Sequence, residues 1–133
     1  MGESAPIRVL IADDDPRYLR SLEALIEQQP ELTVVAVAYD GEEALELAAE
    51  LEPEAVVLDL HMPRVDGVEA VSRLRTGHPS LCLIALTGDS DGELHRRARA
   101  AGADGVFLKG QLLDNLLASL ARARNLRPAH NGG

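Results

Sequence analysis

Five short apolar runs recur along the chain at intervals of 23 to 26 residues, and this spacing is the strongest constraint on its fold. The runs are Ile7–Ala12, Leu32–Ala38, Ala55–Leu58, Leu81–Leu86 and Gly105–Leu108. Because nearly every position in them is apolar, they are typical of strands buried on both faces. Segments with helical periodicity follow each run, the last over the leucine-rich residues 112–120. The sequence therefore predicts an α/β fold: a doubly wound five-stranded parallel sheet with five helices.

The size and charge of the chain limit its organisation and its partners. Its 133 residues suffice for one compact domain, which we expect to span residues 1–124. Residues 125–133 contain a proline and a glycine pair, so we expect a C-terminal tail or the start of a linker there. The net charge is −9 and the pI is near 4.8. Nucleic acid and anionic lipid attract basic surfaces, so we expect neither as a direct partner of this chain.

The single cysteine and the hydropathy pattern predict a cytoplasmic protein. One cysteine, Cys82, excludes an internal disulfide and any multi-cysteine zinc site, and it suits a reducing compartment. No segment approaches the roughly eighteen consecutive apolar residues of a membrane span. The N-terminal residues also lack the basic and then apolar pattern of a secretion signal. We therefore expect no contact with a membrane.

Helix capping accounts for several of the acidic residues. Asp15 precedes Pro16, which suits the first turn of a helix. Asp40 and Asp66 each stand three residues before a glutamate, as in a capping box, and Ser90 has the same spacing. Because capping is a sufficient role, we assign no chemistry to these residues.

Three other carboxylates, one hydroxyl and one ammonium come directly after predicted strands. They are Asp13, Asp14, Asp59, Thr87 and Lys109. In a doubly wound sheet, ligands bind at the carboxyl ends of the strands, so we expect these side chains to meet at one edge. Each is ordinary at a strand end by itself, and only their joint placement indicates a site.

The gathering of three carboxylates predicts a metal site that supports phosphoryl transfer. Like charges held together raise one another's pKa values, so the cluster needs a compensating cation. A small set of oxygen ligands, with room for water and phosphate oxygens, favours Mg²⁺. A carboxylate can itself accept the phosphoryl group while metal and ammonium offset the charge. Asp59 is the best acceptor, because it is the lone acid ending an apolar run, whereas Asp13 and Asp14 form a pair suited to holding metal.

Four segments of the chain, in order, resemble the motifs of response-regulator receiver domains. They are Val9–Pro16, Val56–Gly67, Leu83–Gly88 and Gly102–Lys109. The resemblance extends from about residue 7 to residue 124. The Asp-Asp-x-Pro opening, together with the lack of proline after Lys109, is most similar to the NarL/FixJ (LuxR-type) subgroup. The resemblance implies a flavodoxin-like sheet with strand order 2-1-3-4-5.

The resemblance also implies a role for each site residue. Asp59 is the expected phosphoacceptor, and Thr87 and Lys109 are expected to contact the phosphoryl group as the other catalytic residues. The expected Mg²⁺ ligands are Asp13, Asp14, Asp59 and the backbone carbonyl of His61.

The function implied by the resemblance is a phosphorylation-controlled signalling switch and not an enzyme. A sensor histidine kinase is the expected phosphoryl donor, and phosphorylation is expected to favour a homodimer. The subgroup usually carries a C-terminal helix-turn-helix domain, so DNA is expected as a partner only through such an output domain, outside this chain. A stand-alone receiver for protein–protein signalling or phosphorelay is the alternative.

Two other functions fit the residues less well. A haloacid-dehalogenase-like phosphatase would use Asp13 and Asp15, but Arg17 stands where that family needs threonine. A flavodoxin-like nucleotide binder would need a Ser/Thr/Gly-rich phosphate loop after the first strand, where this chain has acids that repel phosphate.

One position departs from the receiver pattern. Receivers commonly place an aromatic residue three positions before the lysine, and here that residue is Val106. Phe107 is the next residue, and adjacent side chains of a strand point to opposite faces. The usual aromatic switch is therefore not expected to operate in this chain.

Overall fold

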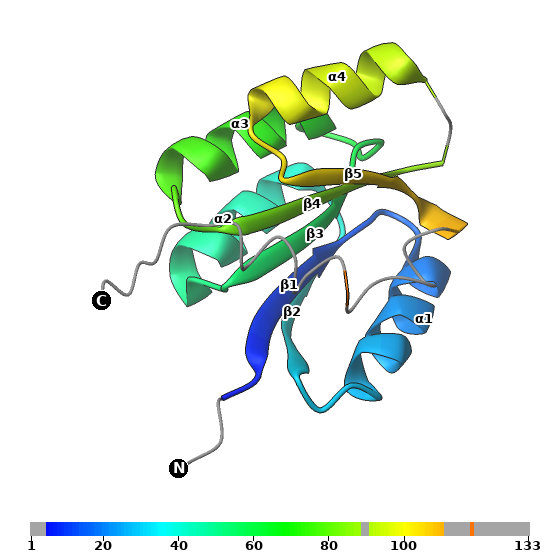
Figure 1. The fold of residues 1–133 in the computed structure, drawn as a ribbon, viewed down its shortest axis with the longest axis vertical. Coiled ribbons are helices and arrows are strands. Elements are labelled where there is room, and N and C mark those ends of the chain that lie inside the picture. The colour runs from blue at the N-terminus through cyan, green and yellow to red at the C-terminus, as the bar shows by residue number, and fades with distance from the viewer. Residues whose placement is uncertain (1–4, 89–90, 111–117, 119–133) are drawn as a thin grey trace.

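Five parallel strands form one sheet in the computed structural model, which describes residues 5–88, 91–110 and 118. The strands are β1 (Ile7–Ala12), β2 (Leu32–Ala38), β3 (Ala55–Asp59), β4 (Cys82–Thr87) and β5 (Gly105–Leu108). The helices are α1 (Pro16–Glu27), α2 (Gly41–Leu51), α3 (Gly67–Gly77) and α4 (Gly92–Ala101). The strand order is β2-β1-β3-β4-β5 (Figure 1), so the predicted parallel sheet and its order are confirmed.

The described part of the chain contains four helices where five were predicted. The fifth predicted helix, over residues 112–120, and the predicted tail of residues 125–133 lie almost wholly outside the described residues, so both stay predictions. Strand boundaries differ from expectation by one residue at β3, which includes Asp59, and at β4, which begins at Cys82 and includes Thr87. Within the described residues, every helix is too short or too polar to cross a membrane.

The sheet separates two apolar cores. α1 covers one face, and α2, α3 and α4 cover the other (Figure 1). Successive residues of β1 belong to different cores. Val9 and Ile11 pack on the α1 side, whereas Leu10 packs on the side of the other three helices. All three are completely buried. Burial on both faces explains why the strands are apolar at nearly every position.

Aspartates cap the helices that begin beyond the carboxyl edge of the sheet. Asp15, Asp40 and Asp66 accept hydrogen bonds from backbone N–H groups in the first turns of α1, α2 and α3, as predicted. For α4 the predicted cap, Ser90, is wrong: Asp91 takes that position and accepts from the N–H groups of the first turn. The helix starts one residue later than the spacing to the glutamate indicated, because Asp91 is itself a strong cap.

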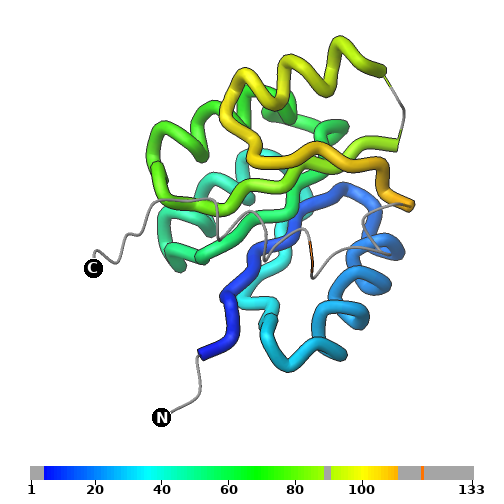
Figure 2. The backbone as a smooth tube through the Cα atoms, in the orientation of Figure 1, coloured from blue at the N-terminus to red at the C-terminus, as the bar shows by residue number. Residues whose placement is uncertain are grey.

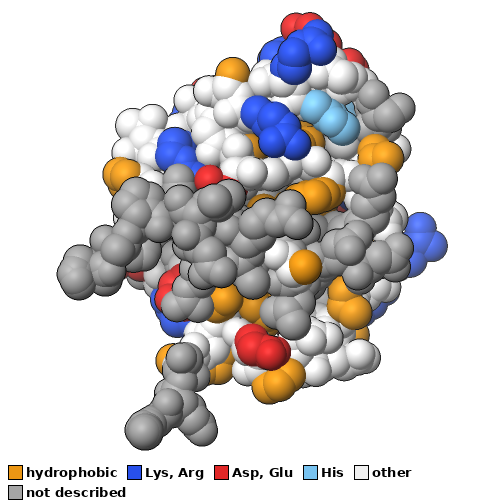
Figure 3. Space-filling model, in the orientation of Figure 1, with side chains coloured by type: hydrophobic (Ala, Val, Ile, Leu, Met, Phe, Trp, Pro, Cys, Tyr) orange, Lys and Arg blue, Asp and Glu red, His pale blue; other side chains and the backbone are white. Residues whose placement is uncertain are grey.

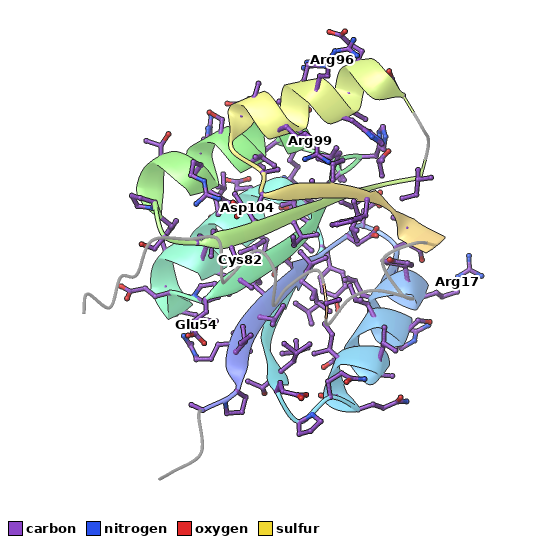
Figure 4. The ribbon with its side chains drawn as sticks, in the orientation of Figure 1. Arg17, Glu54, Cys82, Arg96, Arg99 and Asp104 are labelled. Atoms are coloured by element: carbon purple, nitrogen blue, oxygen red, sulfur yellow. The ribbon has the colours of Figure 1, made fainter. Side chains whose placement is uncertain are left out.

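Arg75, near the end of α3, ties together the edge of the sheet opposite the carboxyl ends. Its guanidinium donates to three carbonyl oxygens of the α3–β4 connection at 2.8–3.3 Å. It also donates to the carbonyl of Gly102 at 2.9–3.0 Å and to Asp104, labelled in Figure 4, at 2.9 Å. Asp104 in turn accepts from the N–H of Leu83. The arginine therefore joins α3 and β4 to the turn that ends α4.

Arg75→Met is expected to lower the free energy of unfolding by about 2–4 kcal/mol, because it removes the cationic partner of Asp104 and the hydrogen bonds that the guanidinium donates to several carbonyl groups. The matched control is Arg73→Met, which removes an exposed pair with Glu69 and is expected to change stability by less than about 1 kcal/mol. Urea unfolding monitored by circular dichroism measures both. Equal losses in the two variants would contradict the role assigned to Arg75.

Candidate functional site

The residues predicted to form the site lie at one edge of the sheet. Asp13 and Asp14 directly follow β1, and Lys109 directly follows β5. Asp59 and Thr87 are the last residues of β3 and β4, whereas we expected them to come just after these strands. The four strands are neighbours in the sheet, so their carboxyl ends bring these side chains to a common place. Figure 2 shows the end of β5 lying beside the β1–α1 turn.

The three aspartates form a compact acidic cluster. One carboxylate oxygen from each of Asp13, Asp14 and Asp59 lies within 4.8 Å of the other two. Asp13 and Asp59 are only 1% and 3% exposed, whereas Asp14 is exposed. Backbone N–H groups hold the buried pair: that of Asp15 donates to Oδ1 of Asp13 at 2.9 Å, and that of His61 donates to Oδ1 of Asp59 at 3.2 Å. Each buried carboxylate therefore keeps Oδ2 for another partner.

Lys109 supplies positive charge to both buried carboxylates. Its Nζ lies 2.7 Å from Oδ2 of Asp13 and 3.5 Å from Oδ2 of Asp59. Burial of the ammonium lowers the pKa of Lys109, but the hydrogen bond to Asp13 and the charge of Asp59 outweigh this effect, so the pKa is raised overall. The lysine is therefore cationic at neutral pH. Three carboxylates and one ammonium leave two negative charges uncompensated when all four groups are ionised.

Burial makes Asp59 an unusually basic carboxylate. Loss of water contact and then the charge of Asp13 raise its pKa from 3.8 to about 6, against the opposing effects of the His61 N–H group and Lys109. Ionisation of Asp59 at pH 7.5 therefore lowers the free energy of unfolding. A group that brings further positive charge to this cluster would raise that free energy again.

Thr87 is buried at the end of β4, and its hydroxyl meets the ring of His61. Oγ1 of Thr87 lies 3.3 Å from Nε2 of His61. The backbone before His61 is held firmly, because the N–H of Leu60 donates to the carbonyl of Leu86 at 2.8 Å. A Cβ at Gly67 would stand 2.3 Å from the Leu60 carbonyl oxygen, so only glycine allows α3 to start this close. His61 is thereby placed between Asp59 and Thr87; the ligand role predicted for its carbonyl stays a prediction.

Tyr18, in the first turn of α1, is a site residue that sequence reasoning missed. Nζ of Lys109 lies 4.6 Å from the centre of the Tyr18 ring, and the phenol donates a long hydrogen bond of 3.4 Å to the Lys109 carbonyl. Burial raises the pKa of Tyr18 to about 12, which the charge of Lys109 only partly offsets, so the phenol is neutral. Its position five residues after Asp13, early in the helix that leaves the carboxyl edge, was the available signal.

Val106 and Phe107 lie on opposite sides of the sheet, as predicted. Val106 belongs to the core under α2, α3 and α4, whereas Phe107 packs against the core on the α1 side. The position that is commonly aromatic in receivers therefore presents a small aliphatic side chain toward α4.

A parallel sheet in this strand order, with acidic residues, a threonine and a lysine at its carboxyl edge, is the architecture of a receiver domain. Residues 9–121 match the response regulator receiver domain family. The chain belongs to that family and is the receiver domain of a response regulator, a signalling module controlled by phosphorylation.

Curated relatives include transcriptional regulators. The chain is 34% identical over 123 residues to the nitrate/nitrite response regulator protein NarL of Escherichia coli, which covers 92% of this chain and 57% of that protein. It is also 34% identical over 127 residues to the transcriptional regulatory protein LnrK of Bacillus subtilis, covering 96% of this chain and 55% of the relative. The chain thus spans about half the length of these two relatives. The predicted resemblance to NarL-type regulators is confirmed.

Other similarities are to part of a longer enzyme and to isolated receiver domains. A protein-glutamate methylesterase/protein-glutamine glutaminase of Myxococcus xanthus is 41% identical over 105 residues, which cover 78% of this chain and 30% of that enzyme. The response regulator domain of CheB from Thermotoga maritima has a TM-score of 0.84 at 28% identity, covering 92% of this chain and 99% of that one. The receiver domain of a NarL from Mycobacterium tuberculosis has a TM-score of 0.87 at 23% identity, covering 93% and 100%, and shows the shared fold.

Asp59→Asn is expected to stabilise the metal-free protein at pH 7.5 by roughly 1–3 kcal/mol, because asparagine removes a buried charge whose pKa is raised from 3.8 to about 6. Between about pH 6 and pH 4 the folded wild type keeps a proton that the unfolded chain releases. The destabilisation of the wild type by Asp59 therefore decreases as the pH falls. The free energies of unfolding of the wild type and Asp59→Asn become similar toward pH 4.

Urea unfolding in EDTA at pH 7.5, 6.0 and 4.5 measures this difference. Asp40→Asn is the matched control, because asparagine caps a helix as well as aspartate does. The prediction would be contradicted if the increase in the free energy of unfolding of Asp59→Asn were the same at all three pH values, or if that free energy decreased at pH 7.5.

Proposed function

We propose that Asp59 accepts a phosphoryl group from the phosphohistidine of a sensor histidine kinase. An oxygen of the Asp59 carboxylate attacks phosphorus, a new O–P bond forms, and the P–N bond to the imidazole breaks as the histidine leaves. The product is an acyl phosphate. The observation that carries this proposal is the placement of Asp59, buried at the end of β3 with Lys109 3.5 Å from its Oδ2.

The donor set of the acidic cluster fits Mg²⁺. Its three carboxylates approach within 4.8 Å and carry more negative charge than Lys109 balances, and oxygen ligands of this kind prefer a hard divalent ion. Asp13, Asp14, Asp59 and the backbone carbonyl of His61 are the residues that would hold the ion. When bound, Mg²⁺ offsets negative charge on the transferring phosphoryl group.

Lys109 and Thr87 complete the proposed site. Lys109, already between the two buried carboxylates, would pair with phosphoryl oxygens once Asp59 is modified. The Thr87 hydroxyl, 3.3 Å from the His61 ring, would turn to donate a hydrogen bond to the phosphoryl group. This movement would draw in the backbone that follows β4. The contacts with the phosphoryl group shift the equilibrium toward the active conformation only if they form in that conformation and not in the resting one.

The proposed output is transcription, through a helix-turn-helix domain that follows residues 125–133 as its linker. The support is the similarity to NarL and LnrK, of which this chain covers 57% and 55%. In this proposal residues 1–124 form the cytoplasmic receiver with five helices, and phosphorylation promotes a homodimer.

Figure 3 shows basic side chains gathered over α4, where Arg96, Arg97 and Arg99 are exposed, on a chain of net charge −9. Such a local basic surface suits contact with an acidic surface of a partner or second copy.

The gene sequence beyond codon 133 tests the output. About sixty further residues that include a recognition helix would support the proposal, since such helices read DNA in the major groove. A stop codon, or the catalytic domain of a methylesterase, would contradict it.

Wild-type protein incubated with Mg²⁺ and a small phosphodonor is expected to gain one phosphoryl group, and Asp59→Asn none. Intact mass spectrometry measures the adduct, which hydroxylamine should remove because an acyl phosphate is attacked by amine nucleophiles. Asp40→Asn should react like the wild type. An unmodified wild type, an adduct on Asp59→Asn, or resistance to hydroxylamine would contradict the assignment of Asp59.

Mg²⁺ is expected to stabilise the folded protein, by about 1.4 kcal/mol at ten times its dissociation constant. Asp14→Asn should lose most of this gain, because it removes a ligand at an exposed position where the substitution leaves no buried group unpaired. Thermal unfolding with and without the ion, at constant ionic strength, measures the effect. An equal shift for wild type and Asp14→Asn would exclude Asp14 as a ligand.

A further inference from the structure

We propose that Tyr18 is a positioning residue, whose ring holds the Lys109 ammonium where it can move from the aspartates to an incoming phosphoryl group. The proposal deepens the function given above and rests on it for the identity of the phosphoryl group. The juxtaposition itself is independent of that function.

The ammonium of Lys109 contacts both charged and aromatic groups. Its Nζ lies 2.7 Å from a carboxylate oxygen of Asp13 and 3.5 Å from one of Asp59. The centre of the Tyr18 ring lies 4.6 Å from the same nitrogen, within the range of a cation–π contact. The Lys109 side chain is only 26% exposed, so water competes weakly for the ammonium. The ring is therefore a significant partner of this cation.

Tyr18 also contacts the backbone of Lys109. Its hydroxyl donates to the Lys109 carbonyl at 3.4 Å, a long bond that adds to the ring contact. The next residue, Gly110, has no side chain, and no atom of the described residues beyond its chain neighbours lies within 4 Å of the place where its Cβ would be. This bond from α1, 91 residues away in sequence, is a second and weaker link between Tyr18 and Lys109.

The two kinds of contact differ in what they allow the ammonium to do. An ion pair with Asp13 fixes it at one oxygen and opposes its departure. The face of a ring attracts a cation over a broad area, so the ammonium can shift toward a phosphoryl oxygen without leaving the ring. With an aliphatic residue at position 18, the acids alone would hold the lysine, and its transfer would be less favourable.

Phosphorylation kinetics test the proposal. With a small phosphodonor and saturating Mg²⁺, Tyr18→Leu is expected to form the acyl phosphate about five- to tenfold more slowly than wild type. Tyr18→Phe keeps the ring and should stay within about twofold. Tyr39→Leu, at an exposed tyrosine outside the site, is the matched control and should react at the wild-type rate. Equal rates for Tyr18→Leu and wild type, or equal losses in the leucine and phenylalanine variants, would overturn the role of the ring.

A second measurement needs no phosphorylation. Lys109 is the only lysine among the 133 residues, so protein labelled with ¹³C-lysine gives one set of side-chain signals. The ring should shift the ε-methylene protons upfield in wild type and in Tyr18→Phe, and the shift should vanish in Tyr18→Leu. An unshifted signal in folded wild type would overturn the juxtaposition. A shifted signal together with no adduct on Asp59 would instead refute the proposed function and leave the contact standing.

Discussion

The ion pairs of Lys109 with Asp13 and Asp59 are the interaction on which this site depends. Two carboxylates that are 1% and 3% exposed sit at neighbouring strand ends, where isolated charges would strongly oppose folding. The chain places its single lysine, beside twelve arginines, at this point. A compact ammonium can share itself between two oxygens and then a third group, whereas a guanidinium fork favours one fixed bidentate partner. The same interaction thus permits a buried acidic cluster and, in the proposed function, would leave Asp59 able to accept a phosphoryl group.

The sheet and most of the site were predictable because parallel topology converts sequence position into spatial position. A residue that follows a buried parallel strand must lie at the carboxyl edge, so Asp13, Asp59 and Lys109 could be brought together without knowledge of any side-chain contact. Tyr18 and Arg75 escaped prediction for the converse reason. Both lie on helices, where tyrosine and arginine are ordinary residues, and their partners are 91 and 29 positions away along the chain. Periodicity shows which face of a helix is buried, but not which distant group a polar tip will meet.

Conformational coupling in this domain has to work without an aromatic side chain at position 106. Val106 faces the core beneath α4, whereas Phe107 packs against the core on the other side of the sheet. A valine has few rotamers and little reach, so in the proposed function a change at the Thr87 hydroxyl would have to reach α4 through the backbone that follows it. Gly88 is the first residue of that backbone, and, its chain neighbours aside, none of the atoms that the structure describes lies within 4 Å of the place where its Cβ would be.

The C-terminal end of α4 is fixed to Arg75 of α3, which would limit how such a change spreads. Its C-terminal end passes through Gly102 (φ +125°), whose carbonyl accepts two bonds from Arg75 and where a Cβ would stand 2.7 Å from the arginine side chain. Asp104 is fixed to the same guanidinium. The N-terminal end, capped by Asp91, is joined through a short connection to Thr87. In the proposed function, a displacement that begins at the end of β4 would therefore reach the start of α4 first, and the exposed arginines of this helix, of which Arg96 and Arg99 are labelled in Figure 4, would move with it.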